Sequence, residues 1–120
     1  MWIFTETGFV SAVVSNQDPT KMMVRARDKK SLMDLSTLSG EDILEIPNRD
    51  YPYRVITDKK TLKTWMAGMI DIAEYSNFKS RVSVTRGGEF VRALHDVWAV
   101  MHDVTDTAKA KKNSLYYDYK

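Results

Sequence analysis

The sequence predicts an α+β domain, with an antiparallel-rich sheet of four or five strands and about three helices packed on one face. Two observations predict this class. Short β-rich runs separated by turn residues occupy residues 2–27, and apolar residues recur at helical spacing over 59–75 and 89–104. The composition agrees, because 120 residues with 43% hydrophobic and 28% charged residues suffice for one domain with a modest core.

The first two strands are predicted at residues 2–5 and 9–14, joined as a β-hairpin. Both runs are rich in aromatic and β-branched residues, and the turn between them contains Gly8, which can adopt a positive φ. A third strand is predicted at 22–27, where apolar residues occupy every second position, as in a half-buried strand. Its apolar face carries Met22, Val24 and Ala26, and its other face carries Arg25 and Arg27.

A short helix is predicted at 28–38. Asp28 stands where an N-cap residue belongs, and leucines follow it at helical spacing. Gly40 comes shortly after the last of them, in the position where helices commonly end.

The acidic segment 41–50 carries four carboxylates and one arginine, a net charge of −3, and its residues 43–46 are a candidate edge strand. The next strand is predicted at 51–57. Pro52 lacks a backbone N–H, so it suits only the first residues of a strand or the edge of a sheet.

Two longer helices are predicted at 59–75, capped by Asp58, and at 89–104, while residues 77–84 fit either a short helix or a loop. The apolar stripe of the first comprises Leu62, Trp65, Met66, Met69, Ile72 and Ala73; that of the second comprises Phe90, Ala93 or Leu94, Val97 and Met101.

Residues 1–104 are predicted to form the single domain and residues 105–120 a flexible basic and aromatic tail. The longest stretch without charge, residues 7–17, is too short to cross a bilayer. The first residues also lack the basic region of a signal peptide. We therefore expect a cytoplasmic protein without membrane contact.

The residue types exclude many classes of enzyme and metal site. With no cysteine, the chain has no disulfide, thiol nucleophile or cysteine-bound zinc. His95 and His102 would stand about 10 Å apart on one helix, too far to share a metal ion without other ligands, so we expect His95 to pack against Trp98. Motifs of hydrolases, P-loops and dinucleotide sites are missing. We expect no catalytic residue, no cofactor and no metal.

Positive charge gathers in residues 21–30, with a net charge of +4, and in residues 54–63, with a net charge of +3. Each segment contains Asp-Lys-Lys followed by Ser or Thr and Leu at a predicted strand-to-helix junction. If the two strand–helix units stood side by side in parallel, both helix N-termini would lie at one end of the sheet and could bind an anion. The candidate residues for binding a partner or an anion are Arg25, Arg27, Lys29, Lys30, Arg54, Lys59 and Lys60.

Interpretations of these residues without a binding role stay open. The lysines can be solvated, and the arginines can cover apolar sheet surface or pair with the acidic segment 41–50. Tyr51 and Tyr53, together with Arg25 and Arg27, would resemble a single-strand nucleic-acid binder if all were exposed on one face. Strand tyrosines more often pack against their neighbours.

Five motifs stand out along the chain: Trp2-Ile3-x-Thr5-x-x-Gly8-Phe9-x-Ser11-x-Val13, Val24-Arg25-Ala26-Arg27-Asp28, Asp50-Tyr51-Pro52-Tyr53-Arg54, Asn77-Phe78-Lys79 and His95-Asp96-Val97-Trp98. Together they resemble a family of small uncharacterised proteins of bacteria, phages and prophages. The resemblance extends to about Met101 and implies one compact α+β domain in a phage or mobile-element setting, without an assigned activity or a catalytic residue. The tail departs from it.

Three hypotheses of function follow. The first is a non-enzymatic interaction protein of phage or prophage type that binds host machinery, with a defence complex as the favoured target, as in anti-CRISPR inhibitors. The alternative is a nucleotide or nucleic-acid binding module that uses the lysine-bearing helix N-termini. The third, an enzyme using His95 with nearby carboxylates, has no motif behind it. A homodimer is compatible with an exposed aromatic sheet face.

Overall fold

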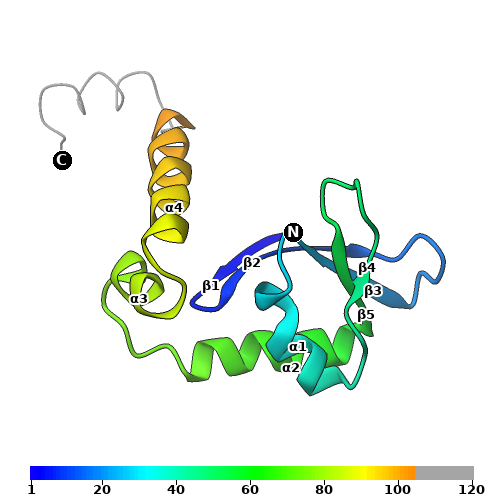
Figure 1. The fold of residues 1–120 in the computed structure, drawn as a ribbon. Helices are drawn as coiled ribbons and strands as arrows, with labels where there is room; N and C mark the ends of the chain where they lie inside the picture. Colours follow the sequence, from blue (N-terminus) through cyan, green and yellow to red (C-terminus); the bar gives the residue numbers. More distant parts are fainter. Residues whose placement is uncertain (105–120) are drawn as a thin grey trace, which may run out of the picture.

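A five-stranded sheet of order β1-β2-β3-β5-β4 is the centre of the structure, a computed structural model that describes residues 1–104 (Figure 1). Every neighbouring pair is antiparallel, so the predicted α+β class is confirmed. The prediction of a flexible tail at 105–120 lies outside the described residues. The strands are β1 (Trp2–Thr5), β2 (Gly8–Val14), β3 (Lys21–Ala26), β4 (Leu44–Glu45) and β5 (Tyr53–Asp58).

The described residues contain four α-helices and two short 3-10 helices. Residues 78–85 are a helix, because the Asn77 side chain accepts the Ser80 N–H at 2.9 Å and caps it. Asp58 caps α2 in the same way, accepting the Thr61 N–H at 2.7 Å. The helices are η1 (Lys30–Leu32), α1 (Met33–Ser39), α2 (Lys59–Asp71), α3 (Phe78–Thr85), α4 (Gly88–Met101) and η2 (His102–Val104).

Helix α2 is shorter than the predicted 59–75, since it ends at Asp71. The backbone of Asn77 is extended, as an N-cap requires, so the chain leaves one helix before the next can begin. Among the described residues, no helix is both long enough and apolar enough to cross a membrane.

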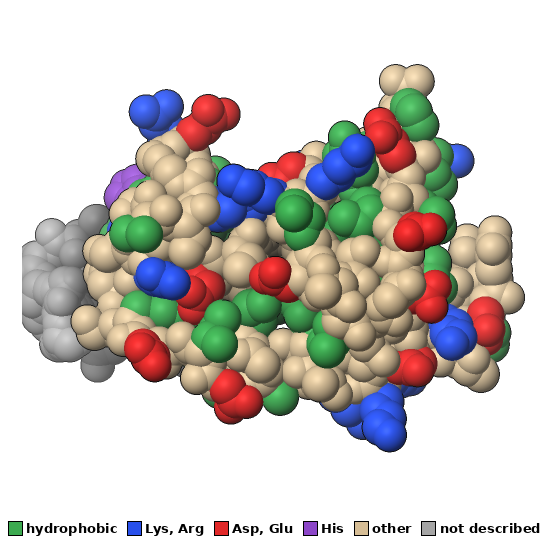
Figure 2. Space-filling view, turned by 60° about the horizontal axis from the view of Figure 1, so that its bottom comes forward, with side chains coloured by type: hydrophobic (Ala, Val, Ile, Leu, Met, Phe, Trp, Pro, Cys, Tyr) green, Lys and Arg blue, Asp and Glu red, His purple; other side chains and the backbone are tan. Residues whose placement is uncertain are grey.

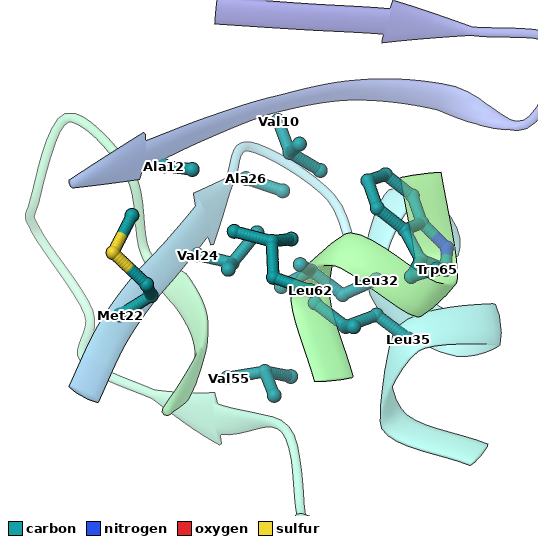
Figure 3. Packing of buried hydrophobic residues seen from close by; sticks show 10 residues of the cluster. All are labelled: Val10, Ala12, Met22, Val24, Ala26, Leu32, Leu35, Val55, Leu62 and Trp65. Atoms are coloured by element: carbon teal, nitrogen blue, oxygen red, sulfur yellow. The ribbon is translucent and has the colours of Figure 1, made fainter. Parts of the chain in front are cut away.

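The core lies between one face of the sheet and the helices η1, α1 and α2 (Figure 3). Alternate residues of β2, β3 and β5 point into it, as the period-two pattern of 22–27 predicts. Trp65 of α2 is only 3% exposed and is the largest side chain of this cluster. The cluster comprises Val10, Ala12, Met22, Val24, Ala26, Leu32, Leu35, Val55, Leu62 and Trp65.

Helix α4 does not join the other helices on that face. It rises on the opposite side of the sheet from α1 and α2, beside the β1–β2 turn (Figure 1). There Phe90, Leu94 and Val97 line a hollow together with Phe4 and Phe9. Of the three predicted helices, those at 28–38 and 59–75 share one face, whereas the helix at 89–104 packs against the aromatic end of the other face.

A polar junction attaches α3 and α4 to the sheet. The buried Glu6 carboxylate accepts from Arg81 Nε at 2.7 Å, and its backbone carbonyl accepts from the Thr85 hydroxyl. Gly8, with φ +150°, brings the turn so close that an added Cβ would overlap Ser31 and lie 2.6 Å from Arg86 Nη1. The Arg86 junction, as we name it, comprises Glu6, Thr7, Asp28, Ser31, Arg81, Thr85, Arg86 and Phe90.

Candidate interaction face

Two arginines lie directly opposite each other on the face of the sheet that α1 and α2 leave open. Arg25 of β3 and Arg54 of β5 are register partners in an antiparallel pair. Both side chains are half-buried. Like charges in this position repel each other and destabilise a sheet, so the pair has a cost that the fold alone does not explain.

Hydrogen bonds to neutral groups hold the two guanidinium groups. Arg25 Nη2 donates to the Ser11 hydroxyl at 2.7 Å, and Arg54 Nη2 donates to the Tyr51 carbonyl at 3.3 Å. Arg54 Nη1 also contacts Met23 Sδ at 3.2 Å. The Nε atom of each arginine is buried without a hydrogen-bond partner. Within residues 1–104, neither arginine forms an ion pair with a carboxylate.

Tyr51 lies between two arginines. Tyr51 is only 8% exposed, and its ring centroid lies 4.6 Å from the guanidinium carbon of Arg25 and 4.9 Å from that of Arg27. These cation–π contacts orient both side chains. Arg27 also pairs with Asp50 at 3.0 Å, but both side chains of that pair are exposed, so the pair is weak. We name the set Arg25, Arg27, Arg54 and Tyr51 the arginine cluster.

The lysines predicted to share an anion site do not come together. Because β3 and β5 are antiparallel, with Lys21 opposite Asp58 and Ala26 opposite Tyr53, the chain leaves the two strands at opposite ends of the sheet. The parallel arrangement of the two strand–helix units, on which the predicted anion site depends, is therefore wrong. The exposed pair Lys29 and Lys30 therefore lies at one end, and the exposed pair Lys59 and Lys60 lies at the other.

The lysines have solvated surroundings. Lys29 Nζ stands 4.0 Å from an oxygen of the exposed Glu45 and 5.8 Å from the ring centroid of the half-buried Tyr53, and both contacts are weak. On the side that carries α2, Figure 2 shows basic and acidic side chains interspersed. Among the predicted site residues, only Arg25, Arg27 and Arg54 form a cluster.

An apolar groove adjoins the arginine cluster. Its volume is about 390 Å³, and it lies between the open face of β1 and β2 and the inner side of α4. Arg27 belongs to the arginine cluster and also lines the groove. The ring centroids of Phe9, in the groove, and Tyr51, in the cluster, are 6.4 Å apart. We name it the α4 groove, lined by Trp2, Phe4, Phe9, Arg27, Asp28, Ser31, Phe90, Ala93, Leu94 and Val97.

Sequence patterns do not reveal this groove or the role of Arg86. Arg86 Nη1 donates to the Thr7 carbonyl at 2.8 Å, and its other nitrogen pairs with Asp28. These contacts join residues 79 and 58 positions apart. Periodicity reports only which side of an element is apolar, and not which distant element covers it.

His95 lies on α4 and His102 begins η2, and both are exposed. The exposed His95 ring stacks on Trp98 at 5.6 Å, as predicted, and Trp98 also contacts His102 at 5.5 Å. Residues 1–104 contain no group of three His, Cys, Asp or Glu side chains placed to hold a metal ion.

Asp28 makes stability depend on pH. Burial raises the pKa of this carboxyl, but hydrogen bonds from Ser31 and Arg86 outweigh that effect and leave the pKa below its ordinary value of 3.8. The stabilisation is therefore fully present above pH 3.8 and is lost as the pH falls through the folded-state pKa. We expect urea midpoints that are constant near neutrality and fall in acid, and a shallower fall in Asp28→Asn. An equal fall in both proteins would contradict this role.

No protein-family model, no curated protein and no solved structure matches this chain. The resemblance to the small phage and prophage proteins therefore stays a prediction.

Proposed function

We propose that this protein is a non-enzymatic interaction protein of phage or prophage type, which binds an acidic surface of a host protein through the arginine cluster. A component of a defence complex is the favoured target, as in anti-CRISPR inhibitors. The observation that supports binding is that Arg25 and Arg54 stand opposite each other on neighbouring strands, with no carboxylate partner within residues 1–104. The phage setting is supported by the five sequence motifs alone.

Carboxylates of a partner would remove the cost of placing these arginines together. In the free protein, two half-buried residues of like charge stand directly opposite each other on neighbouring strands, an arrangement that destabilises a sheet. Arg25 and Arg27 are held in fixed orientations by Tyr51, so little side-chain entropy is lost on binding. Guanidinium groups also bind carboxylates in bidentate geometry. The cluster is thus organised before its partner arrives.

The double variant Arg25→Gln/Arg54→Gln is expected to weaken partner capture at least tenfold, because two charge-assisted hydrogen bonds are lost. Its free energy of unfolding should change little, because the loss of the like-charge repulsion offsets the loss of the hydrogen bonds to Ser11 and Tyr51. The measurement is capture from a bacterial lysate by the full-length tagged protein, with and without nuclease, quantified by mass spectrometry. Urea unfolding of each variant accompanies it.

The matched control is Lys59→Gln/Lys60→Gln, which removes the same charge from exposed side chains at the other end of the sheet. It should capture the same protein as the unchanged chain. Equal losses in both double variants would mean that net charge, and not the arginine cluster, attracts the partner.

A nucleic-acid binder remains the second candidate, because arginines and tyrosine are gathered on one sheet face. Against it, the Tyr51 ring is nearly buried and flanked by Arg25 and Arg27, so it offers little surface for stacking a base. Capture that disappears with nuclease and weakens steeply with salt would favour this candidate instead.

A further inference from the structure

The α4 groove has the size and lining of a pocket for a bulky apolar group. Its volume of about 390 Å³ falls in the range of small-ligand sites. The sheet contributes Trp2, Phe4 and Phe9, and α4 contributes Phe90, Leu94 and Val97. Trp2 is 68% exposed and Val97 is 40% exposed, so the rim of the groove is accessible to a partner.

The polar groups at the end of the groove already have partners. Asp28 Oδ1 accepts from the Ser31 N–H at 3.1 Å and from the Ser31 hydroxyl at 2.6 Å, and Oδ2 accepts from Arg86. A nucleobase would need hydrogen-bond partners for its edge, or it would lose its bonds to water. The groove therefore suits a hydrocarbon or aromatic side chain better than a base.

The charge beside the groove identifies a second feature of the occupant. Arg27 lines the groove and also stacks on Tyr51, whose other guanidinium neighbour is Arg25. A group that enters the groove thus brings its neighbouring atoms next to two guanidinium groups, of which Arg27 has only the exposed Asp50 as its ion-pair partner and Arg25 has no carboxylate partner within residues 1–104. Interfaces commonly combine a buried apolar anchor with polar contacts at its rim.

We propose that the α4 groove binds a bulky apolar side chain of a protein segment whose adjacent carboxylate pairs with the arginine cluster. This inference rests on the proposed function and specifies the segment that is recognised, an acidic stretch with one aromatic or large aliphatic anchor. The groove supplies burial and the arginines supply orientation. Each part alone binds weakly, and together they act as one site.

A small aromatic carboxylate tests the site without knowledge of the partner. Indole-3-propionate, titrated into the full chain and followed by amide NMR shifts, is expected to perturb Phe9, Phe90 and Leu94 with a dissociation constant of about 1 mM, typical of a ligand of this size. Indole-3-propionamide, which lacks the charge, should bind several-fold more weakly. Absent shifts, or shifts confined to other surfaces, overturn the proposal.

Two alanines of α4 provide a matched pair of variants. Ala93 is exposed and lines the groove, so Ala93→Trp fills it, whereas Ala99 is exposed on the same helix and lines none of the described cavities. We expect Ala93→Trp to abolish the indole-3-propionate shifts and to reduce partner capture at least tenfold. Ala99→Trp should change neither, and both variants should keep the unfolding midpoint of the unchanged protein.

The outcomes separate this proposal from the proposed function. Capture that depends on Arg25 and Arg54 but is unchanged in Ala93→Trp overturns the groove and leaves an arginine-dependent interaction protein. Capture that depends on neither overturns both. If Ala93→Trp instead converts a dimer in solution into a monomer, the occupant is a second copy of this chain and the proposed host segment is wrong.

Discussion

Trp65→Ala is expected to lower the free energy of unfolding by about 3–5 kcal/mol, the usual cost of truncating a buried tryptophan. Trp65 is 3% exposed and packs with Leu32, Leu35 and Leu62 against the sheet. Its loss leaves a cavity between α1, α2 and β3, and the surrounding side chains can only partly fill it. Urea unfolding followed by circular dichroism measures the change.

The control for this variant is Trp98→Ala, because Trp98 is 56% exposed on α4. It should change the free energy of unfolding by about 0.5 kcal/mol or less. Trp65→Phe should cost much less than Trp65→Ala, since it keeps most of the apolar volume and removes an indole N–H that is buried without a partner. Equal losses in Trp65→Ala and Trp98→Ala would show that the core is centred elsewhere.

Local sequence patterns predicted those elements whose structure depends on neighbouring residues. The alternation at 22–27 placed the buried face of β3, because side chains of a strand point to alternate sides. Asp58 and Gly8 were recognised from turn and cap chemistry, and both have the predicted role. Each of these features depends on residues within a few positions of one another.

The position of α4 could not be predicted in this way. Its apolar stripe indicates that one side is covered, and it does not indicate by which element. Arg86 determines where α4 lies through its contacts with Thr7, Asp28 and Ser31, which lie 55 to 79 residues earlier in the chain. A single arginine before a Gly-Gly pair carries no local sign of such contacts.

The candidate site was predictable in part for the same reason. The spacing of Arg25 and Arg27 predicts that they share one side of the chain, and this needs no tertiary information, although β3 ends at Ala26, one residue before Arg27. Their meeting with Arg54 depends on the register of β3 with β5. The lysines were placed wrongly, because the order of strands along the chain does not reveal whether two neighbours run parallel or antiparallel.

The arginine cluster and the core therefore have different physical origins. The core residues lower the free energy of the fold by removing apolar surface from water. Like charge at Arg25 and Arg54 raises it by a term that an external carboxylate would offset. Residues that destabilise the free protein in this way are expected at sites of function.

Arg86→Ala is expected to lower the free energy of unfolding by about 3 kcal/mol, at the low end for a buried ion pair because Asp28 stays partly solvated. Only 10% of the Arg86 side chain is exposed, and its removal breaks the Asp28 pair and leaves the Thr7 carbonyl without its donor. The stacking on Phe90, at 4.4 Å, is lost as well. Urea unfolding gives the size of the effect.

Hydrogen exchange should locate this effect, because the Arg86 junction is what attaches α3 and α4 to the sheet. Amides of α4 are expected to exchange faster in Arg86→Ala, while amides of β3 should remain the more strongly protected. Arg92 is an exposed arginine of α4, so Arg92→Ala serves as the control and should change neither the free energy of unfolding nor the exchange of α4.

Adding Asp28→Asn to Arg86→Ala should cost less than Asp28→Asn alone, since the two side chains stabilise the fold mainly through each other. Additive costs would contradict the coupling and leave α4 attached by its apolar contacts alone.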